Sequence, residues 1–462
     1  MQGELIIKAE SHLYQEKYDV IIIGSGLGGL AAGSLLSRRN YKILVLERKR
    51  RVGGRFSTIK KDGFKIPTGA IIIPDSWAIK LFNEMGIDMS ALRPLTRIFY
   101  KINGTDYEIS PELGIPMVLN IIDRLERERA EKTGKNITAV NLKEILGGYL
   151  RGIRGVKDEN IVTVRDWLLQ FTENEKVHEV FDELCAALMM AHSWELPITK
   201  FFRFKEMKKF FMASQGNLSI ARALARVIES SGVVWINSRV TKIELKEGWA
   251  TGVVIERNRE RMEISCRAII SDAGPRMTLQ LAGPENFDQA YLKNLRIKIR
   301  PSPSILVLIA SDKPLCLEGI NDGLEIIMGS RRIRTVVPIT NICPELAPPN
   351  QHLLYASVEP ISCIHPVEIQ CEINQIKRDL QELFPHFQKH GRILQIKLCS
   401  DLGNSPEGWT WLGYGMPIET SIPNLFNVGD ACIAPGLIGT TGSVESGYRA
   451  AETVAKLLEG HE

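Results

Sequence analysis

Four glycines near the N-terminus have the spacing of a turn that holds a diphosphate. They follow the apolar run Tyr18–Ile23 and are Gly24, Gly26, Gly28 and Gly29. In such a turn Gly24 makes the tight bend, Gly26 lets the backbone approach a pyrophosphate, and Gly29 lets the next helix pack on the strand. Glu47 closes the next apolar run, where a carboxylate can accept a hydrogen bond from a ribose hydroxyl. These residues predict a bound dinucleotide.

A buried strand and a helix are expected on either side of this turn. Val20–Ile23 is apolar on both faces, as a strand inside a parallel sheet is. A helix from Gly28 to about Arg39 would point its N-terminal N–H groups at the phosphates. The uncharged stretch Val20–Ser37 also fits a membrane span, but five glycines interrupt it, and a spanning helix needs about 20 predominantly apolar residues. We therefore expect strand, turn and helix.

Two further groups of residues extend the site. Near the C-terminus, Asn424–Asp430 (NLFNVGD) is followed by spaced glycines and by a helix-like stretch, Ser443–Leu458. Soon after Glu47, Gly53 and Gly54 permit a close backbone approach, and the Arg55 guanidinium can neutralise a phosphate. Asp430 could alternatively cap a helix or close a turn. Combined with the first turn, these groups favour FAD over NAD and predict a redox enzyme.

The order of these motifs resembles that of the FAD-dependent amine oxidase superfamily. The best match within it is the phytoene-desaturase-like branch, which holds carotenoid desaturases, carotenoid isomerases and retinol saturases. Three more segments carry the resemblance: a middle block from Gln215 to Ile243, the string AIISDAGP at Ala268–Pro275, and GYGMP at Gly413–Pro417. The chain departs from the family at Ile66–Gly69 (IPTG), where an acidic residue often precedes the glycine.

The resemblance implies the α/β fold class, with a Rossmann-like FAD-binding domain of the GR2 type and an inserted α+β substrate domain. Val240 would lie beside the adenine, Asp430 would accept from the ribityl or pyrophosphate region, and a helix entered at Gly442 would point at the flavin. We expect the cofactor-binding residues to be Gly24, Gly26, Gly28, Gly29, Glu47, Arg48, Gly54, Arg55, Gly69, Val240, Gly429, Asp430, Gly442, Ser443 and Val444.

The FAD motifs divide the chain into alternating segments. We predict that 18–75, 206–294 and 401–462 form the FAD-binding domain, and that 76–205 and 295–400 form the substrate domain. The first inserted segment is expected to be helical, with a capping box at Thr163 and Asp166. The second should hold strands at Ser304–Ile309 and Thr335–Ile339 and a helix at Pro366–Leu383.

Composition limits the remaining partners. The net charge of +4 over 462 residues is too small to argue for nucleic acid. Eight cysteines lack CxxC or other metal spacing, so we expect reduced thiols, no metal and a cytoplasmic protein. Met1–Lys17 has no apolar core of a signal peptide. We find no second dinucleotide fingerprint, so a separate nicotinamide domain is not expected.

The segment Phe201–Met212 (FFRFKEMKKFFM) interleaves aromatic and basic residues. One interpretation is an interfacial segment that contacts a membrane surface transiently, at the inner face of the membrane. The other is a core helix or tunnel wall with snorkelling lysines.

The expected function is hydride transfer between flavin N5 and a C–C bond of an apolar, isoprenoid- or carotenoid-like substrate, as in a desaturase, saturase or isomerase. The electron acceptor or donor would be oxygen, a quinone or another carrier. Two alternatives remain: an amine oxidase or protoporphyrinogen-oxidase-like enzyme, with Trp409, Trp411 and Tyr414 as walls, and a non-catalytic FAD-bearing escort protein. No catalytic acid or base is assigned, because lone histidines such as His178 and His192 are more often structural.

Overall fold

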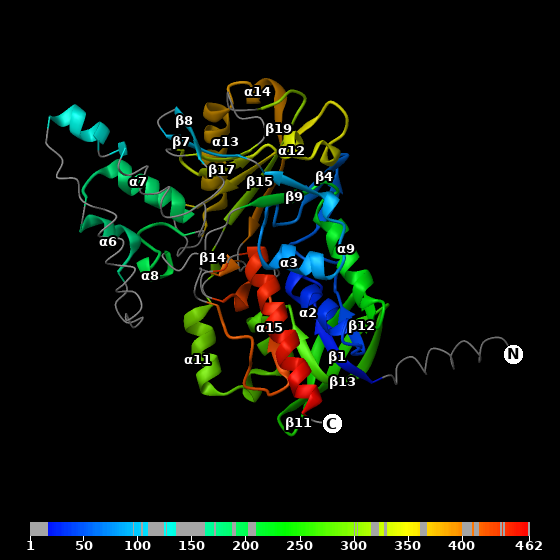
Figure 1. Cartoon of the computed structure of the whole chain (residues 1–462). Coiled ribbons are helices and arrows are strands. Elements are labelled where there is room, and N and C mark those ends of the chain that lie inside the picture. Colours follow the sequence, from blue (N-terminus) through cyan, green and yellow to red (C-terminus); the bar gives the residue numbers. More distant parts are fainter. Residues whose placement is uncertain are drawn as a thin grey trace.

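A computed structural model describes residues 17–460, apart from residues 96, 103–104, 110–123, 126, 135–161, 171, 187–190, 202–208, 300, 303, 316–322, 328–329, 361–366, 400–408, 411–414, 435–436 and 438. Two seven-stranded sheets organise this part of the chain. In Figure 1 the sheet that holds β1 and β13 lies low in the view, and the sheet that holds β15, β17 and β19 lies above it.

The first sheet carries the predicted dinucleotide turn. β1 (Tyr18–Ile23) lies between β2 (Ile43–Leu46) and β13 (Glu260–Ser271) and runs parallel to both. Its apolar residues are buried, which confirms the predicted buried strand. β10 (Val233–Trp235) and β21 (Leu425–Asn427) extend the parallel part, and an antiparallel pair, β11 (Ser238–Lys246) and β12 (Trp249–Arg257), continues from β13.

Three long helices pack beside this sheet. They are α2 (Leu27–Ser37), α9 (Asn217–Ile228) and α15 (Gly439–Glu459), and Figure 1 shows α2 and α15 side by side. A Cβ on Gly447 would lie 2.7 Å from the Gly28 carbonyl oxygen, so α15 approaches the start of α2 closely only because a glycine is there. The helix expected to end near Arg39 ends at Ser37.

The second sheet is built from the predicted inserted segments. Its order is β19 (Gly391–Cys399), β15 (Ser304–Ser311), β18 (His352–Val358), β17 (Ile333–Val337), β16 (Gly323–Ile327), β7 (Arg97–Ile102) and β8 (Thr105–Ile109). The prediction that the first inserted segment is helical is therefore wrong in part, because it supplies β7 and β8. The predicted strands in the second segment and its helix, α13 (Ile369–Leu383), are confirmed, although Ile339 begins a short helix.

Each face of the second sheet has its own core, because alternate strand residues point to opposite sides. Ile305, Val307 and Ile309 of β15 pack with α13. Leu306 and Leu308 pack on the other side with α6 (Val164–Leu169) and α7 (Glu175–Leu184). The capping box at Thr163 and Asp166 is confirmed at the start of α6.

A small three-stranded sheet lies between the cores of the two seven-stranded sheets, which form the two halves of the molecule. β9 (Phe210–Ala213) pairs with β5 (Ile73–Pro74) and with β6 (Leu92–Leu95). Phe210 and Met212 belong to the core shared with α6 and α7, whereas Phe211 and Ala213 pack in the core around β1 and α2. The interfacial interpretation is therefore wrong for Phe210–Met212, and residues 202–208 of that segment lie outside the described residues.

The remaining elements are short or lie at the edges. They are β3 (Thr58–Lys61), β4 (Phe64–Pro67), β14 (Pro301–Ser302), β20 (Trp409–Thr410), α3 (Trp77–Glu84), α8 (Ile198–Phe201), α10 (Pro275–Ala282), α11 (Gln289–Lys298), α12 (Ile339–Ile342), α14 (Phe387–His390), η1 (Met89–Ala91), η4 (Pro284–Asn286), η5 (Pro344–Leu346) and η6 (Asp430–Cys432). The numerical domain boundaries stay a prediction. Within the described ranges, no helix is both long and apolar enough to cross a membrane.

Candidate active site

The first glycine turn leaves no room for side chains. Gly24 follows β1 with φ of +95°, a conformation that favours glycine. A Cβ on Gly26 would lie 2.3 Å from Asp272 Oδ2, one on Gly28 would lie 2.8 Å from the Gly429 nitrogen, and one on Gly29 would lie 2.6 Å from the Gly24 oxygen. The turn therefore keeps the start of α2 free of side chains, as the close approach of a diphosphate to a helix N-terminus requires.

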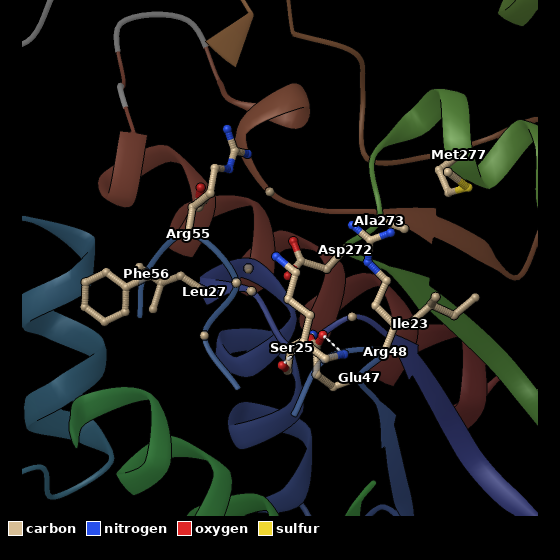
Figure 2. A pocket seen from close by; sticks show the side chains of 18 of the residues that line it. Ile23, Ser25, Leu27, Glu47, Arg48, Arg55, Phe56, Asp272, Ala273 and Met277 are labelled. Carbon is tan, nitrogen blue, oxygen red and sulfur yellow. Dashed lines mark hydrogen bonds between the residues drawn. The ribbon is translucent and has the colours of Figure 1, made fainter. Parts of the chain in front are cut away.

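Glu47 is positioned at the end of β2, beside this turn. The residue is 5 % exposed, and its Oε2 accepts hydrogen bonds from the Ser25 N–H at 3.1 Å and the Ser25 hydroxyl at 2.5 Å. Oε1 accepts from the Lys49 N–H at 2.8 Å. Figure 2 shows Glu47 and Arg48 together on one side of the cavity. The position is the expected one, and the hydrogen bond to a ribose stays a prediction.

Arg55 and Asp430 join the two motifs that lie far apart in sequence. Arg55 Nη2 pairs with Asp430 Oδ2 at 2.9 Å, and the Ser443 hydroxyl donates to Asp430 Oδ1. Arg55 Nη1 is buried and has no hydrogen-bond partner among the residues that the structure describes. A guanidinium with one nitrogen unsatisfied beside a cavity fits an anionic ligand such as a phosphate.

Gly69 and its neighbour hold the backbone of Arg55. The Thr68 hydroxyl donates to the Gly54 carbonyl oxygen at 2.9 Å and to that of Arg55 at 3.2 Å. A Cβ on Gly69 would lie 2.9 Å from Arg55 Cβ. The IPTG string that departs from the family pattern therefore fixes the guanidinium-bearing turn.

The C-terminal helix begins earlier than expected. α15 starts at Gly439, so Gly442 and Ser443 lie within its first turns rather than at its entrance. Gly439, Thr440 and Ser443 line the cavity. Val444 is fully buried in the core, and Gly442 contacts Ile433, where a Cβ would lie 2.5 Å from a side-chain carbon. Gly442 and Val444 therefore support the helix instead of the cavity wall.

One cavity of about 570 Å³ collects most of the predicted cofactor residues. Figure 2 looks into it, with Asp272 between Arg55 on one side and Glu47 and Arg48 on the other. The predicted residues that line it are Gly24, Gly26, Gly28, Glu47, Arg48, Gly54, Arg55, Gly69, Val240, Gly429, Asp430 and Ser443. Gly29 lies behind this wall, where it packs α2 on the turn.

Several lining residues were not singled out from the sequence. Ser25 orients Glu47, and Arg239 lies beside Val240 on β11. Burial and the neighbouring Arg48 guanidinium lower the pKa of Lys49. Asp272 directly follows β13. Its position at the carboxyl end of a parallel strand was a usable signal, because ligands of such sheets bind at those ends.

The two histidines have protein partners. His192 Nδ1 contacts Asp182 Oδ2 at 3.2 Å, and its Nε2 contacts the Pro360 carbonyl oxygen at 2.9 Å. Burial alone would lower the pKa of His192, but the hydrogen bond and charge of Asp182 raise it overall. His178 Nε2 contacts the Thr172 carbonyl oxygen at 2.8 Å. Neither histidine lines the cavity, and both fit the structural interpretation.

The other residues considered for chemistry are only partly visible. Trp409 lies in β20, and Trp411 and Tyr414 lie outside the described residues. In the described part of the chain, no three His, Cys, Asp or Glu side chains are grouped closely enough to hold a metal ion.

Known proteins resemble this chain over part or nearly all of its length. The chain is 25 % identical to an uncharacterized protein of Methanocaldococcus jannaschii, over 82 % of this chain and 86 % of the relative. It is 23 % identical to prolycopene isomerase 2 of an Oncidium hybrid cultivar, over 95 % of this chain and 84 % of the relative. A match to amine oxidase B of Sus scrofa is 29 % identical but covers only 25 % of this chain and 23 % of that protein.

Solved structures share the whole fold. An oxidoreductase from Methanosarcina mazei superposes with a TM-score of 0.75 at 22 % identity, over 96 % of this chain and 100 % of the other. A putrescine oxidase superposes with a TM-score of 0.65 at 15 % identity, over 96 % of this chain and 99 % of the other. Both confirm the Rossmann-like fold with its inserted domain.

The family model for flavin containing amine oxidoreductases matches residues 27–455, which is nearly the whole chain. The unsatisfied nitrogen of Arg55 and the glycine-lined turn fit the cofactor that this family carries. The chain therefore belongs to the flavin containing amine oxidoreductase family, is an oxidoreductase, and has FAD as its cofactor.

Proposed function

We propose that this oxidoreductase acts on C–C bonds of an apolar, isoprenoid- or carotenoid-like substrate by hydride transfer to or from the flavin. FAD supplies the hydride chemistry, at its N5 atom. The glycine turns, Arg55 and Asp430 hold the cofactor, while the inserted half would orient the substrate and exclude water. A desaturase, a saturase and an isomerase are all compatible with this assignment.

The extent of one sequence match carries the proposal. The prolycopene isomerase matches this chain over 95 % of its length, through the inserted segments as well as the FAD motifs. The match to amine oxidase B covers 25 % of the chain, which is too little to include the substrate domain. Since the substrate domain determines specificity, similarity along the whole chain favours a polyene over an amine.

The similarity to putrescine oxidase does not weigh against this proposal. At 15 % identity a TM-score of 0.65 speaks for the fold, and one fold can serve many substrates. An amine remains the competing substrate class, and the experiment below includes it.

The test is an anaerobic visible spectrum of the FAD-loaded protein during titration with vesicles that contain phytoene. Loss of the oxidised flavin band is expected if the enzyme removes hydrogen from the polyene, and vesicles without phytoene should leave the band unchanged. In a second sample, chemically reduced enzyme should regain its yellow colour with a polyene if electrons flow toward the substrate. Product analysis under reducing conditions checks for isomerisation, which leaves no net change in the flavin.

Bleaching by putrescine or another amine, with no response and no isomerised product from any polyene, would replace the proposal by the amine-oxidase assignment. Readmission of oxygen, or of a quinone, to a bleached sample then tests the proposed electron carrier. Co-sedimentation with the same vesicles tests transient contact with a membrane surface.

A further inference from the structure

Asp272 lies where the two FAD motifs meet. It follows β13, the strand between β1 and β21, and its N–H donates to the Ile23 carbonyl oxygen at 2.8 Å. A Cβ on Gly26 would lie 2.3 Å from Asp272 Oδ2, and a Cβ on Gly429 would lie 2.7 Å from Oδ1. One carboxyl group therefore touches the first glycine turn and the second, at the wall of the cavity (Figure 2).

Asp272 is partly buried, and one of its two carboxyl oxygens is shielded from solvent. Its Oδ2 is buried and has no hydrogen-bond partner within the described part of the chain. Burial raises the pKa of Asp272 to about 8. The Gly29 N–H and the Arg55 guanidinium lower the pKa of Asp272, whereas the charges of Asp430 and Glu47 raise it further.

Charged groups reach Asp272 from several elements. Asp430 comes from η6, Glu47 from the end of β2, and Arg55 from the turn after it. α2 (LGGLAAGSLLS) contributes the Gly29 N–H and contains no charged residue. Arg48, Lys49 and Arg239 also line the cavity, but the cation that lowers the pKa of Asp272 is Arg55, and the two carboxylates oppose its effect.

We propose that Asp272 is a cofactor-binding residue that acts in its neutral form, with the protonated carboxyl donating a hydrogen bond toward the FAD diphosphate region instead of repelling it. A diphosphate brings further negative charge to the same turn, and like charges at close range in a partly buried site repel strongly. A protonated carboxyl removes the repulsion and supplies a donor for an acceptor oxygen.

The competing role for Asp272 is purely structural. An ionised Asp272 could stabilise the positive end of α2 without taking part in binding. The two roles differ in their pH dependence. If the neutral form binds, FAD affinity is constant at low pH and falls by up to about tenfold per pH unit once the pH exceeds the pKa of Asp272 in the apoprotein. If the ionised form serves the helix, affinity does not fall in this way.

The experiment measures the dissociation constant of FAD for the full-length apoprotein between pH 6 and pH 10, by quenching of FAD fluorescence. Asp272→Asn keeps the shape and a donor but cannot ionise, so we expect affinity comparable to wild type at pH 6 and no weakening around pH 8 to 9. Asp19→Asn, a change at the opposite end of β1, is the matched control and should keep the wild-type pH profile. The infrared spectrum of the holoenzyme should show the carbonyl band of a protonated carboxylic acid that Asp272→Asn lacks.

A flat wild-type profile, or the same alkaline weakening in Asp272→Asn, would overturn the proposal while leaving FAD as the cofactor. Loss of binding at every pH in Asp272→Asn, together with no carboxylic-acid band in wild type, would assign the ionised, structural role. If wild-type apoprotein bound no FAD at any pH, the cofactor assignment itself would fail.

Discussion

An arginine meets a carboxylate in each half of the molecule, and the two pairs differ in what surrounds them. Arg55 pairs with Asp430 at the cavity wall, where their side chains are 28 % and 16 % exposed and Arg55 Nη1 has no partner in the described residues. Arg332 pairs with Glu372 of α13 at 2.5 Å, with exposures of 14 % and 3 %, and its Nη1 donates to a backbone carbonyl. The first pair leaves a donor for a ligand, and the second holds α13 on its sheet.

This difference distinguishes a binding element from a structural one. The same ion-pair chemistry appears in both halves, so residue type alone does not indicate function. The unsatisfied nitrogen of Arg55 and the cavity beside it indicate a binding role. Variants that remove FAD without unfolding the protein, or unfold it without removing FAD, therefore test the comparison directly.

The largest effect is expected from Gly26→Val. The first side-chain carbon would lie 2.3 Å from Asp272 Oδ2, in the space where the backbone must approach the diphosphate. We expect purified protein without FAD, measured as the ratio of flavin to protein absorbance, with a normal far-ultraviolet circular dichroism spectrum.

Gly248→Ala is the matched control for this variant. Gly248 lies in the turn between β11 and β12 with φ of +80°, and a Cβ there would meet nothing within 4 Å. The strained alanine should cost about 1 kcal/mol of stability and leave FAD loading unchanged. A yellow, fully loaded Gly26→Val protein would refute the close-approach argument.

The next largest effect concerns stability in the inserted half. Arg332→Met would leave Glu372 buried without its partner, which costs about 3–5 kcal/mol of unfolding free energy. We expect a lower urea midpoint by tryptophan fluorescence, with FAD loading unchanged under native conditions. Loss of FAD at a temperature where the protein is folded would show that this pair also serves the cofactor.

A smaller effect is expected for Arg55→Lys. A lysine keeps the charge but cannot satisfy Asp430 and a phosphate with one planar group. We expect FAD affinity to fall about tenfold, which corresponds to about 1.4 kcal/mol, by fluorescence titration of the apoprotein. Arg331→Lys is the matched control. Arg331 pairs with Glu382 on the outer side of α13, so this change should leave the FAD affinity unchanged.

The smallest effect is expected for Thr163→Ala. The Thr163 hydroxyl accepts from the Asp166 N–H at 3.1 Å and caps α6. Its loss should cost about 1 kcal/mol in urea unfolding, because one N–H at the helix start loses its partner. FAD loading should not change, and a measurable change in loading would mean that α6 is coupled to the cofactor half.

The residues that line the cavity were largely predictable because a dinucleotide imposes fixed demands on the chain. A diphosphate needs glycines and a helix start, and a ribose needs an acceptor, so Gly26, Glu47 and Arg55 follow from local patterns. Asp272 could not be inferred from a local pattern, because its role depends on two turns, at Gly26 and Gly429, that meet only in the folded sheet. The start of α15 at Gly439 was missed because several glycines there weaken the helical signal.

The inserted half was less predictable because no constant ligand constrains it. β7 pairs with β16, whose residues follow more than 200 positions later, so the local sequence gives little sign of a strand. By contrast, β15 and α13 have strong local patterns and were predicted. The aromatic and basic segment was ambiguous because alternating strand residues in two cores resemble an amphipathic interfacial pattern.

β9 has a thermodynamic consequence that its short length conceals. Phe210 and Met212 fill one core while Phe211 and Ala213 pack in the other, so neither half can open this strand without exposing apolar surface of both. The two halves are therefore coupled in unfolding as well as in position. Calorimetry of the holoenzyme should show one cooperative transition, in which the stability that FAD adds to its own half also protects the inserted half.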